Sequence, residues 1–150
     1  MIFTEVPRYE FFPDVNGNLS LPEKERVAVE IIRPTGAQRA DFTSVVATRE
    51  FYPDDQPYNT DGTPREPKKL KKVTVRTKFD ADAILHTCVG KITNLSVEST
   101  LADGTKKIRT VTNGTELAEC RAYGIEKLVD AICVEVQSDQ LSESKKKIIG

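Results

Sequence analysis

The chain has few of the side chains on which most catalytic and metal sites depend. Its 150 residues include one histidine, one methionine, three cysteines and no tryptophan. No run approaches the ~20 consecutive apolar residues of a membrane-spanning helix, and the N-terminal stretch lacks the basic start and apolar run of a signal peptide. We therefore expect a protein that is made and used in a cytoplasm and has no membrane partner.

Motifs of bond-making chemistry are also missing. Neither glycine-rich phosphate loop occurs, no Cys/His spacing matches a zinc site, and hydrolase and kinase signatures are absent. The cysteines at 88, 120 and 133 are odd in number and widely spaced, which predicts small buried hydrophobic residues in a reducing compartment. We expect no metal and no cofactor.

The single histidine has one plausible partner. Asp82 precedes His86 by four residues on a predicted helix, so its carboxylate can orient the imidazole. Because no nucleophile accompanies the pair, the pattern favours a partly exposed helix histidine over a catalytic one. The sequence therefore predicts that the protein is not an enzyme.

Charge and length limit the remaining classes. The net charge of −1 argues against a whole-molecule attraction to nucleic acid or anionic lipid, so any such binding has to be local. With 38% hydrophobic and 30% charged residues, the composition is that of an ordinary soluble protein. A chain of this length predicts a single domain over residues 1–150.

One stretch, from Asp14 to Glu25, resembles a calcium loop in its ligand spacing. The positions that carry ligands in an EF-hand are occupied by Asp14, Asn16, Asn18, Ser20, Pro22 and Glu25. The glycine required at position 6 is Leu19, and the flanking segments are aromatic and β-branched, which favours strands over helices. The stretch is therefore interpreted as a turn or short loop joining two strands around Asn16-Gly17.

Alternating and helical patterns predict the elements. We expect strands at 2–6, 9–12, 26–32 and 71–79, and a hairpin of 95–99 with 106–111 around Asp103-Gly104. The 71–79 strand is expected to be half-buried, with one face made by Val73, Val75, Thr77 and Phe79.

Helices are expected at 36–47, 81–92, 112–121, 125–137 and 139–150. The first is capped by Thr35, and its core-facing residues would be Ala37, Ala40 and Val45. The 125–137 segment has the strongest periodicity and should be a core helix. The fold class is thus α+β, with a small mostly antiparallel sheet, four or five helices and a helical C-terminal third.

The segment 52–67 contains four prolines together with Asp, Asn and Gly, which predicts a long exposed loop. Loops of this length in compact domains are often functional. Phe51, Tyr52 and Tyr58 are candidate anchors for a protein partner, because tyrosine offers a large amphipathic contact at little entropic cost. The alternative is that these tyrosines lie back on their own domain.

A basic segment follows the loop and is opposed there only by Glu66. Its residues are Arg65, Lys68, Lys69, Lys71, Lys72, Arg76 and Lys78. One interpretation is nucleic-acid binding, since clustered Lys and Arg displace counterions from phosphate. The favoured interpretation is a solvated or protein-facing surface, which acidic patches elsewhere would make self-complementary.

The order of elements resembles a family. The stretches "VEIIRPTGAQRADFT", "AILHTCVGKITNLS", "NGTEL", "IEKLVDAICVEVQ" and "SDQLSESKKK" together resemble phage or prophage morphogenesis proteins, and among them the tail assembly chaperones of long-tailed phages. The resemblance implies a non-enzymatic protein of the host cytoplasm that binds tape-measure and tail-tube proteins or copies of itself. Because those chaperones are largely helical, the proline-rich loop and the N-terminal strands leave a second role open. That role is a structural virion subunit of the tail or neck, such as a tail terminator or connector.

Overall fold

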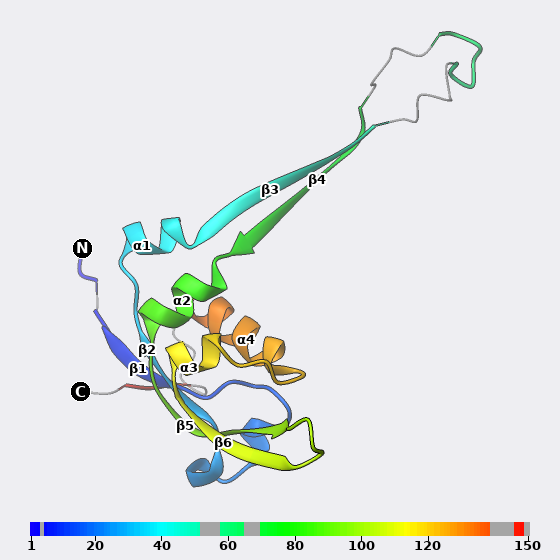
Figure 1. Cartoon of the computed structure of the whole chain (residues 1–150). Coiled ribbons are helices and arrows are strands. Elements are labelled where there is room, and N and C mark those ends of the chain that lie inside the picture. The colour runs from blue at the N-terminus through cyan, green and yellow to red at the C-terminus, as the bar shows by residue number, and fades with distance from the viewer. Residues whose placement is uncertain (4, 52–57, 65–69, 139–145, 149–150) are drawn as a thin grey trace. The chain divides into compact units, whose positions relative to one another are not determined.

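A computed structural model describes residues 1–3, 5–51, 58–64, 70–138 and 146–148 of the chain (Figure 1). It divides into two compact units where the sequence predicted one domain. The first unit, here called the body, comprises Met1–Phe42 and Asp80–Gly150, and the second, here called the ribbon, comprises Thr43–Phe79.

The body contains a five-stranded sheet in which every neighbouring pair is antiparallel. In spatial order, the strands are β6 (Lys106–Asn113), β5 (Val89–Thr100), β2 (Ala28–Ile32), β1 (Arg8–Phe11) and β7 (Lys146–Ile148). The predicted strand at 26–32 is confirmed, because the alternation in β2 places Val29 and Ile31 in the core without exposed surface. The predicted hairpin is confirmed as β5 and β6, with longer strands than expected.

Over the described residues there are four α-helices, and all of them belong to the body. They are α1 (Gly36–Asp41), α2 (Ala81–Cys88), α3 (Gly114–Ala118) and α4 (Ile125–Gln137). The periodicity of α4 is confirmed, because its buried residues fall on one stripe: Leu128, Ile132, Cys133 and Val136. Since α2 contacts α3, α4, β2 and β5, the helices close the core against the sheet (Figure 1).

Some predicted boundaries are wrong. The strand expected at 2–6 does not form over its described residues, and Ile2 and Phe3 are exposed. The helix expected at 81–92 ends at Cys88, because β-branched Val89 and Gly90 favour an extended chain and Ile92 pairs with Val29.

The helix expected at 36–47 is also too long. It stops at Asp41, and the β-branched residues that follow form a strand, so Val45 is 69% exposed and does not face the core. Ala37 and Ala40 are likewise not buried. The cap at Thr35 is confirmed, because its side chain accepts a hydrogen bond from Gln38 N–H.

The C-terminal third holds α3 and α4 together with strands β6 and β7. A final helix was expected over 139–150. Residues 146–148 are instead a strand that pairs with β1, and residues 139–145 lie outside the described part of the chain. The α+β class, with a small antiparallel sheet and four α-helices, is confirmed.

The stretch from Asp14 to Glu25 joins β1 to β2 as a loop, as interpreted. Asn16 and Gly17 have φ values of 51° and 75°, in the left-handed region that Asn and Gly tolerate best. Two short 3₁₀ turns follow, at Asn18–Ser20 and Glu23–Glu25. Strands β1 and β2, not helices, flank the stretch, so the EF-hand interpretation is excluded.

Candidate functional site

The ribbon is built from two strands, β3 (Thr43–Phe51) and β4 (Leu70–Phe79), which pair antiparallel. Thr43 lies opposite Phe79 and Glu50 opposite Lys72. Because directly opposed residues point to the same side of a ribbon and successive residues alternate, this register separates the side chains into two faces.

The two faces differ in chemistry. One, here called the apolar face, carries Val45, Ala47, Arg49, Val73, Val75 and Thr77, next to the half-buried pair of Thr43 and Phe79 on the same side. The other, here called the basic face, carries Ser44, Val46, Thr48, Glu50, Lys72, Thr74, Arg76 and Lys78. The alternation predicted for 71–79 is confirmed and continues across β3.

The apolar face is not covered by any described part of the chain. Val45 is 69% exposed, Val75 63% and Val73 45%. The prediction of a half-buried strand is therefore wrong. The alternation of apolar and polar residues is present, but no described part of the chain packs on these valines. A two-stranded hairpin is marginally stable by itself in water, and full burial of one valine side chain contributes about 1.5–3 kcal/mol. The ribbon thus leaves the burial of these valines unused within the described residues.

Charge is unevenly divided between the two units. The sequence of the ribbon contains eight Lys and Arg and five Asp and Glu, a net charge of +3, which leaves −4 for the body. On the ribbon, Lys71 Nζ lies 3.5 Å from Glu50 Oε1. Arg49 stands out because it is an exposed guanidinium on the apolar face, and it forms no ion pair with any other described residue.

The predicted contact residues are only partly described. Phe51 is 48% exposed at the end of β3, and Tyr58 is 64% exposed in the turn formed by residues 58–64. That turn is closed by a hydrogen bond from Asn59 N–H to the Thr63 carbonyl and by a bridge between Tyr58 and Pro64.

On β4, Lys71 and Lys72 are exposed. Four candidates lie outside the described residues, namely Tyr52, Arg65, Lys68 and Lys69, as does most of the predicted 52–67 loop. A partner-binding role for these eight residues stays a prediction.

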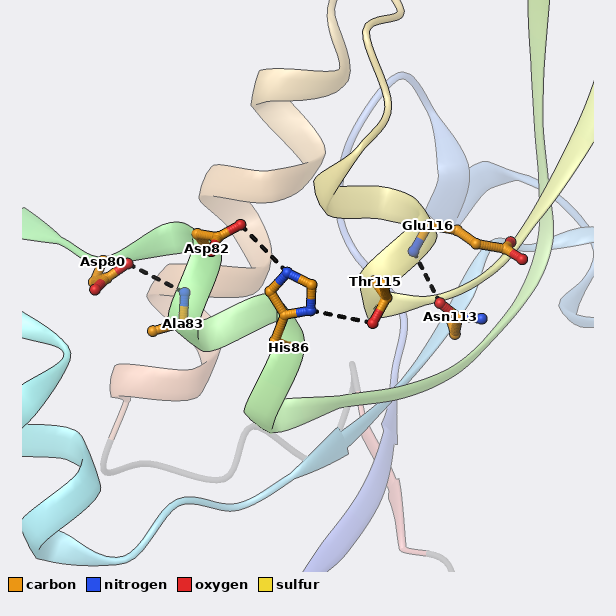
Figure 2. A network of polar contacts seen from close by, with 7 residues as sticks. All are labelled: Asp80, Asp82, Ala83, His86, Asn113, Thr115 and Glu116. Atoms are coloured by element: carbon orange, nitrogen blue, oxygen red, sulfur yellow. Dashed lines mark hydrogen bonds and ion pairs between the residues drawn. The ribbon is translucent and has the colours of Figure 1, made fainter.

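The histidine, in the last turn of α2, lies beside the first turn of α3 (Figure 2). Its Nε2 is 3.4 Å from Asp82 Oδ1, one turn earlier on α2, and its Nδ1 is 3.1 Å from Thr115 Oγ1 on α3. Each helix is capped independently, since Asp80 accepts a hydrogen bond from Ala83 N–H and Asn113 accepts one from Glu116 N–H.

Both ring nitrogens of His86 are therefore engaged, and the side chain is 42% exposed. The prediction of a partly exposed helix histidine is confirmed. Sequence reasoning identified Asp82 as its partner but gave no sign of Thr115, which is 29 residues away. The observed contacts make His86 a link between α2 and α3.

The thiols are placed as small hydrophobic residues. Cys88 and Cys133 are buried and all three cysteines are free. Burial raises the pKa of the Cys88 thiol to about 11, and burial together with the Asp130 charge raises the pKa of Cys133 to about 11. Both thiols are protonated at neutral pH and are poor nucleophiles. Within the described ranges, no three His, Cys, Asp or Glu side chains gather as a metal site would require.

An apolar pocket of about 270 Å³ lies in the body, beside the start of α4. Its lining comes from the loop before β2, from β5 and from the first turns of α4, and includes Val15, Leu21, Leu95 and Leu128. None of its lining residues is ionisable. Ser96 contributes a hydroxyl to the lining, but no lining residue can act as its general base.

A second hollow of about 320 Å³, here called the helix groove, lies between α2, α3 and α4. Its floor contains Leu85 and Leu117, which are buried, and its rim carries three exposed carboxylates, Asp82, Glu126 and Asp130. No Lys or Arg lines it. Sequence reasoning missed the groove, because Glu126 and Asp130 share a helical turn but nothing local places α4 against α2.

Comparison of the chain with protein-family models, with curated proteins and with solved structures found no match. Over the described residues, no helix has both the length and the apolar character needed to cross a membrane.

Proposed function

We propose that the protein is a non-enzymatic assembly protein that acts through contacts between its ribbon and other protein subunits. The observation that carries this proposal is the apolar face, where Val45, Val73 and Val75 stand exposed on an otherwise regular amphipathic ribbon. Leaving several valines of one face exposed to water costs free energy, and exposed apolar surface of this kind marks interaction sites.

The chemistry of the body supports the non-enzymatic part. The histidine is held between two helices, the two buried thiols have raised pKa values, and the apolar pocket has no ionisable lining residue. These features are typical of side chains that pack and hydrogen-bond within a domain.

The setting we propose is phage or prophage morphogenesis, on the resemblance of the sequence. The resemblance implies a tail assembly chaperone, and the departures from it leave open a structural virion subunit of the tail or neck. We favour the structural subunit. The body is built on a five-stranded sheet and the second unit is a β-ribbon, whereas those chaperones are largely helical. Sedimentation of finished virions distinguishes the two roles. A structural subunit stays in the particles and sediments with them, while a chaperone is absent from the particles and remains in the host cytoplasm.

The basic face supports a second candidate, a nucleic-acid-binding accessory protein. Lys72, Arg76 and Lys78 share that face of β4. Titration with DNA and RNA at low salt tests this candidate, which requires binding that weakens steeply as salt rises. Charge reversal at Lys72 and Lys78, which share that face, has to weaken the complex equally on all sequences, and the absence of a complex eliminates the candidate.

The proposed contact surface is tested with the double variant Val45→Ser and Val75→Ser. Both valines are exposed, so the free energy of unfolding should change by only about 0.5 kcal/mol. Self-association of the purified chain, measured by sedimentation velocity, should weaken at least about tenfold, because two apolar contacts are lost from the interface.

Val46→Ser on the basic face is the matched control and should leave association unchanged. If the double variant associates as tightly as the wild-type chain, the apolar face is not the contact surface.

A further inference from the structure

We propose that the apolar face of the ribbon of one copy docks in the helix groove of a second copy, with Arg49 between the carboxylates of Glu126 and Asp130. This inference rests on the proposed assembly function and names the partner surface. It pairs two apolar surfaces of the chain that no described residue covers. One is the apolar face of the ribbon, and the other is the helix groove with its acidic rim.

The apolar parts of the two surfaces match. The groove offers a floor of buried leucines with small or half-buried residues around it, including Ala81, Ala118 and Val129. Its volume of about 320 Å³ equals on the order of ten water molecules, which is room for several aliphatic side chains. The face presents Val45, Val73 and Val75 beside the small side chain of Ala47, which are aliphatic groups of a size that the groove accommodates.

The charges match as well. Arg49 is the charged residue among the six on the apolar face, and the groove rim has three carboxylates and no cation. Glu126 and Asp130 form no ion pair with another described residue. A guanidinium placed between two carboxylates forms charge-assisted hydrogen bonds and keeps its aliphatic stem on the apolar floor. The net charges of the two units, +3 and −4, favour the same pairing.

Packing of one apolar face directly on another is disfavoured. Two such faces would bury two Arg49 side chains, and neither face has a carboxylate to compensate them. The acid-rimmed groove supplies those carboxylates, which makes the body of the partner the better occupant.

Docking between copies and docking within one chain differ in their consequences for mixed variants. Only docking between copies allows a chain with a defective ribbon to pair with a chain that has a defective groove.

The contact is heterologous, because a ribbon on one copy meets a groove on the next. Such contacts repeat around a ring or along a filament, and every copy uses both surfaces. This geometry predicts that two variants, each defective in a different surface, complement one another when they are mixed.

The test uses two full-length charge variants, Arg49→Glu and the pair Glu126→Lys with Asp130→Lys. Each alone should associate at least about tenfold more weakly than wild type in sedimentation velocity at low salt, because like charges then face each other. An equal mixture should associate nearly as tightly as wild type, since it contains one native and one reversed charge pairing.

Arg76→Glu on the basic face and Asp41→Lys at the end of α1 are the matched controls, and neither should weaken association. If wild type associates but the mixture does not recover, the helix groove is not the partner surface, while the assembly function stands. If the charge variants associate normally, the inference fails in the same way. A wild-type chain that stays monomeric at its highest soluble concentration overturns docking between copies, and sedimentation with finished particles then decides the assembly function separately.

Discussion

Asn18 shows how one buried polar side chain shapes the loop between β1 and β2. Only 6% exposed, it donates to the carbonyls of Pro13 and Val27 at 2.9 and 3.0 Å and accepts from Val27 N–H at 2.7 Å. The amide thus satisfies three backbone groups that the irregular loop leaves without a partner in the sheet. In the sequence the same residue suggested a calcium ligand, because the spacing of polar residues does not reveal which of them point inward.

Asn18→Ala should lower the free energy of unfolding by about 2–4 kcal/mol, since three buried or part-buried backbone groups lose their partner. Chemical denaturation monitored by circular dichroism measures the loss. Asn16→Gly, in the same loop, is the control and should change little, because Asn16 has a positive φ that glycine adopts freely. Equal stability of Asn18→Ala and wild type would show that water replaces the amide at no cost.

At the scale of elements, α2 and α3 approach each other closely. A β-carbon on Gly114, the first residue of α3, would meet the backbone oxygen of Leu85 and lie 2.8 Å from Val89 Cβ. The glycine is therefore required by the packing of one helix on the end of the other. His86 and Thr115 link the same two helices on their exposed side (Figure 2).

Gly114→Ala should destabilise the body by about 1–3 kcal/mol, because the contact is with backbone that has no room to move. Thermal unfolding measures the effect. Gly36→Ala is the matched control: Gly36 is likewise the first residue of a helix, but open space surrounds it, so the substitution should be neutral or stabilise slightly. Equal effects of the two substitutions would contradict a steric role for Gly114.

The whole molecule consists of a body interrupted by the ribbon. The two ends of the body at the interruption meet, since Asp80 N–H donates to the Phe42 carbonyl at 2.8 Å. Phe42 itself is buried. The body therefore has a closed connection at the point where the ribbon is inserted, which is where insertions are tolerated best.

Replacing Thr43–Phe79 with a two- or three-residue turn should leave the body folded, with a melting temperature within about 5 °C of the full chain. Far-ultraviolet circular dichroism and thermal unfolding are the measurements. The shortened chain should also lose self-association, because it has the groove without the ribbon. A shortened chain that fails to unfold cooperatively would show that the body depends on the ribbon for its stability.

Local pattern determined the elements that depend on neighbours in sequence: strand β2, helix α4, the hairpin of β5 and β6, and the cap at Thr35. Each follows from periodicity or from a side chain that bonds to backbone three residues away. The predicted boundary of α2 failed because the helical period of apolar residues continues past Cys88, while β-branched Val89 and Gly90 favour an extended chain that pairs with β2.

Only the tertiary structure decided what lies against what. The alternation of Val73 and Val75 predicts an apolar face, but pattern alone does not say whether a second layer covers it, because burial depends on residues distant in sequence. For the same reason no local pattern indicates that Asp82, Glu126 and Asp130 share one rim, since Asp82 precedes Glu126 by 44 residues (126 − 82). The amino-acid pattern determined which surfaces are apolar and which are charged, and long-range packing decided which of them remain open to a partner.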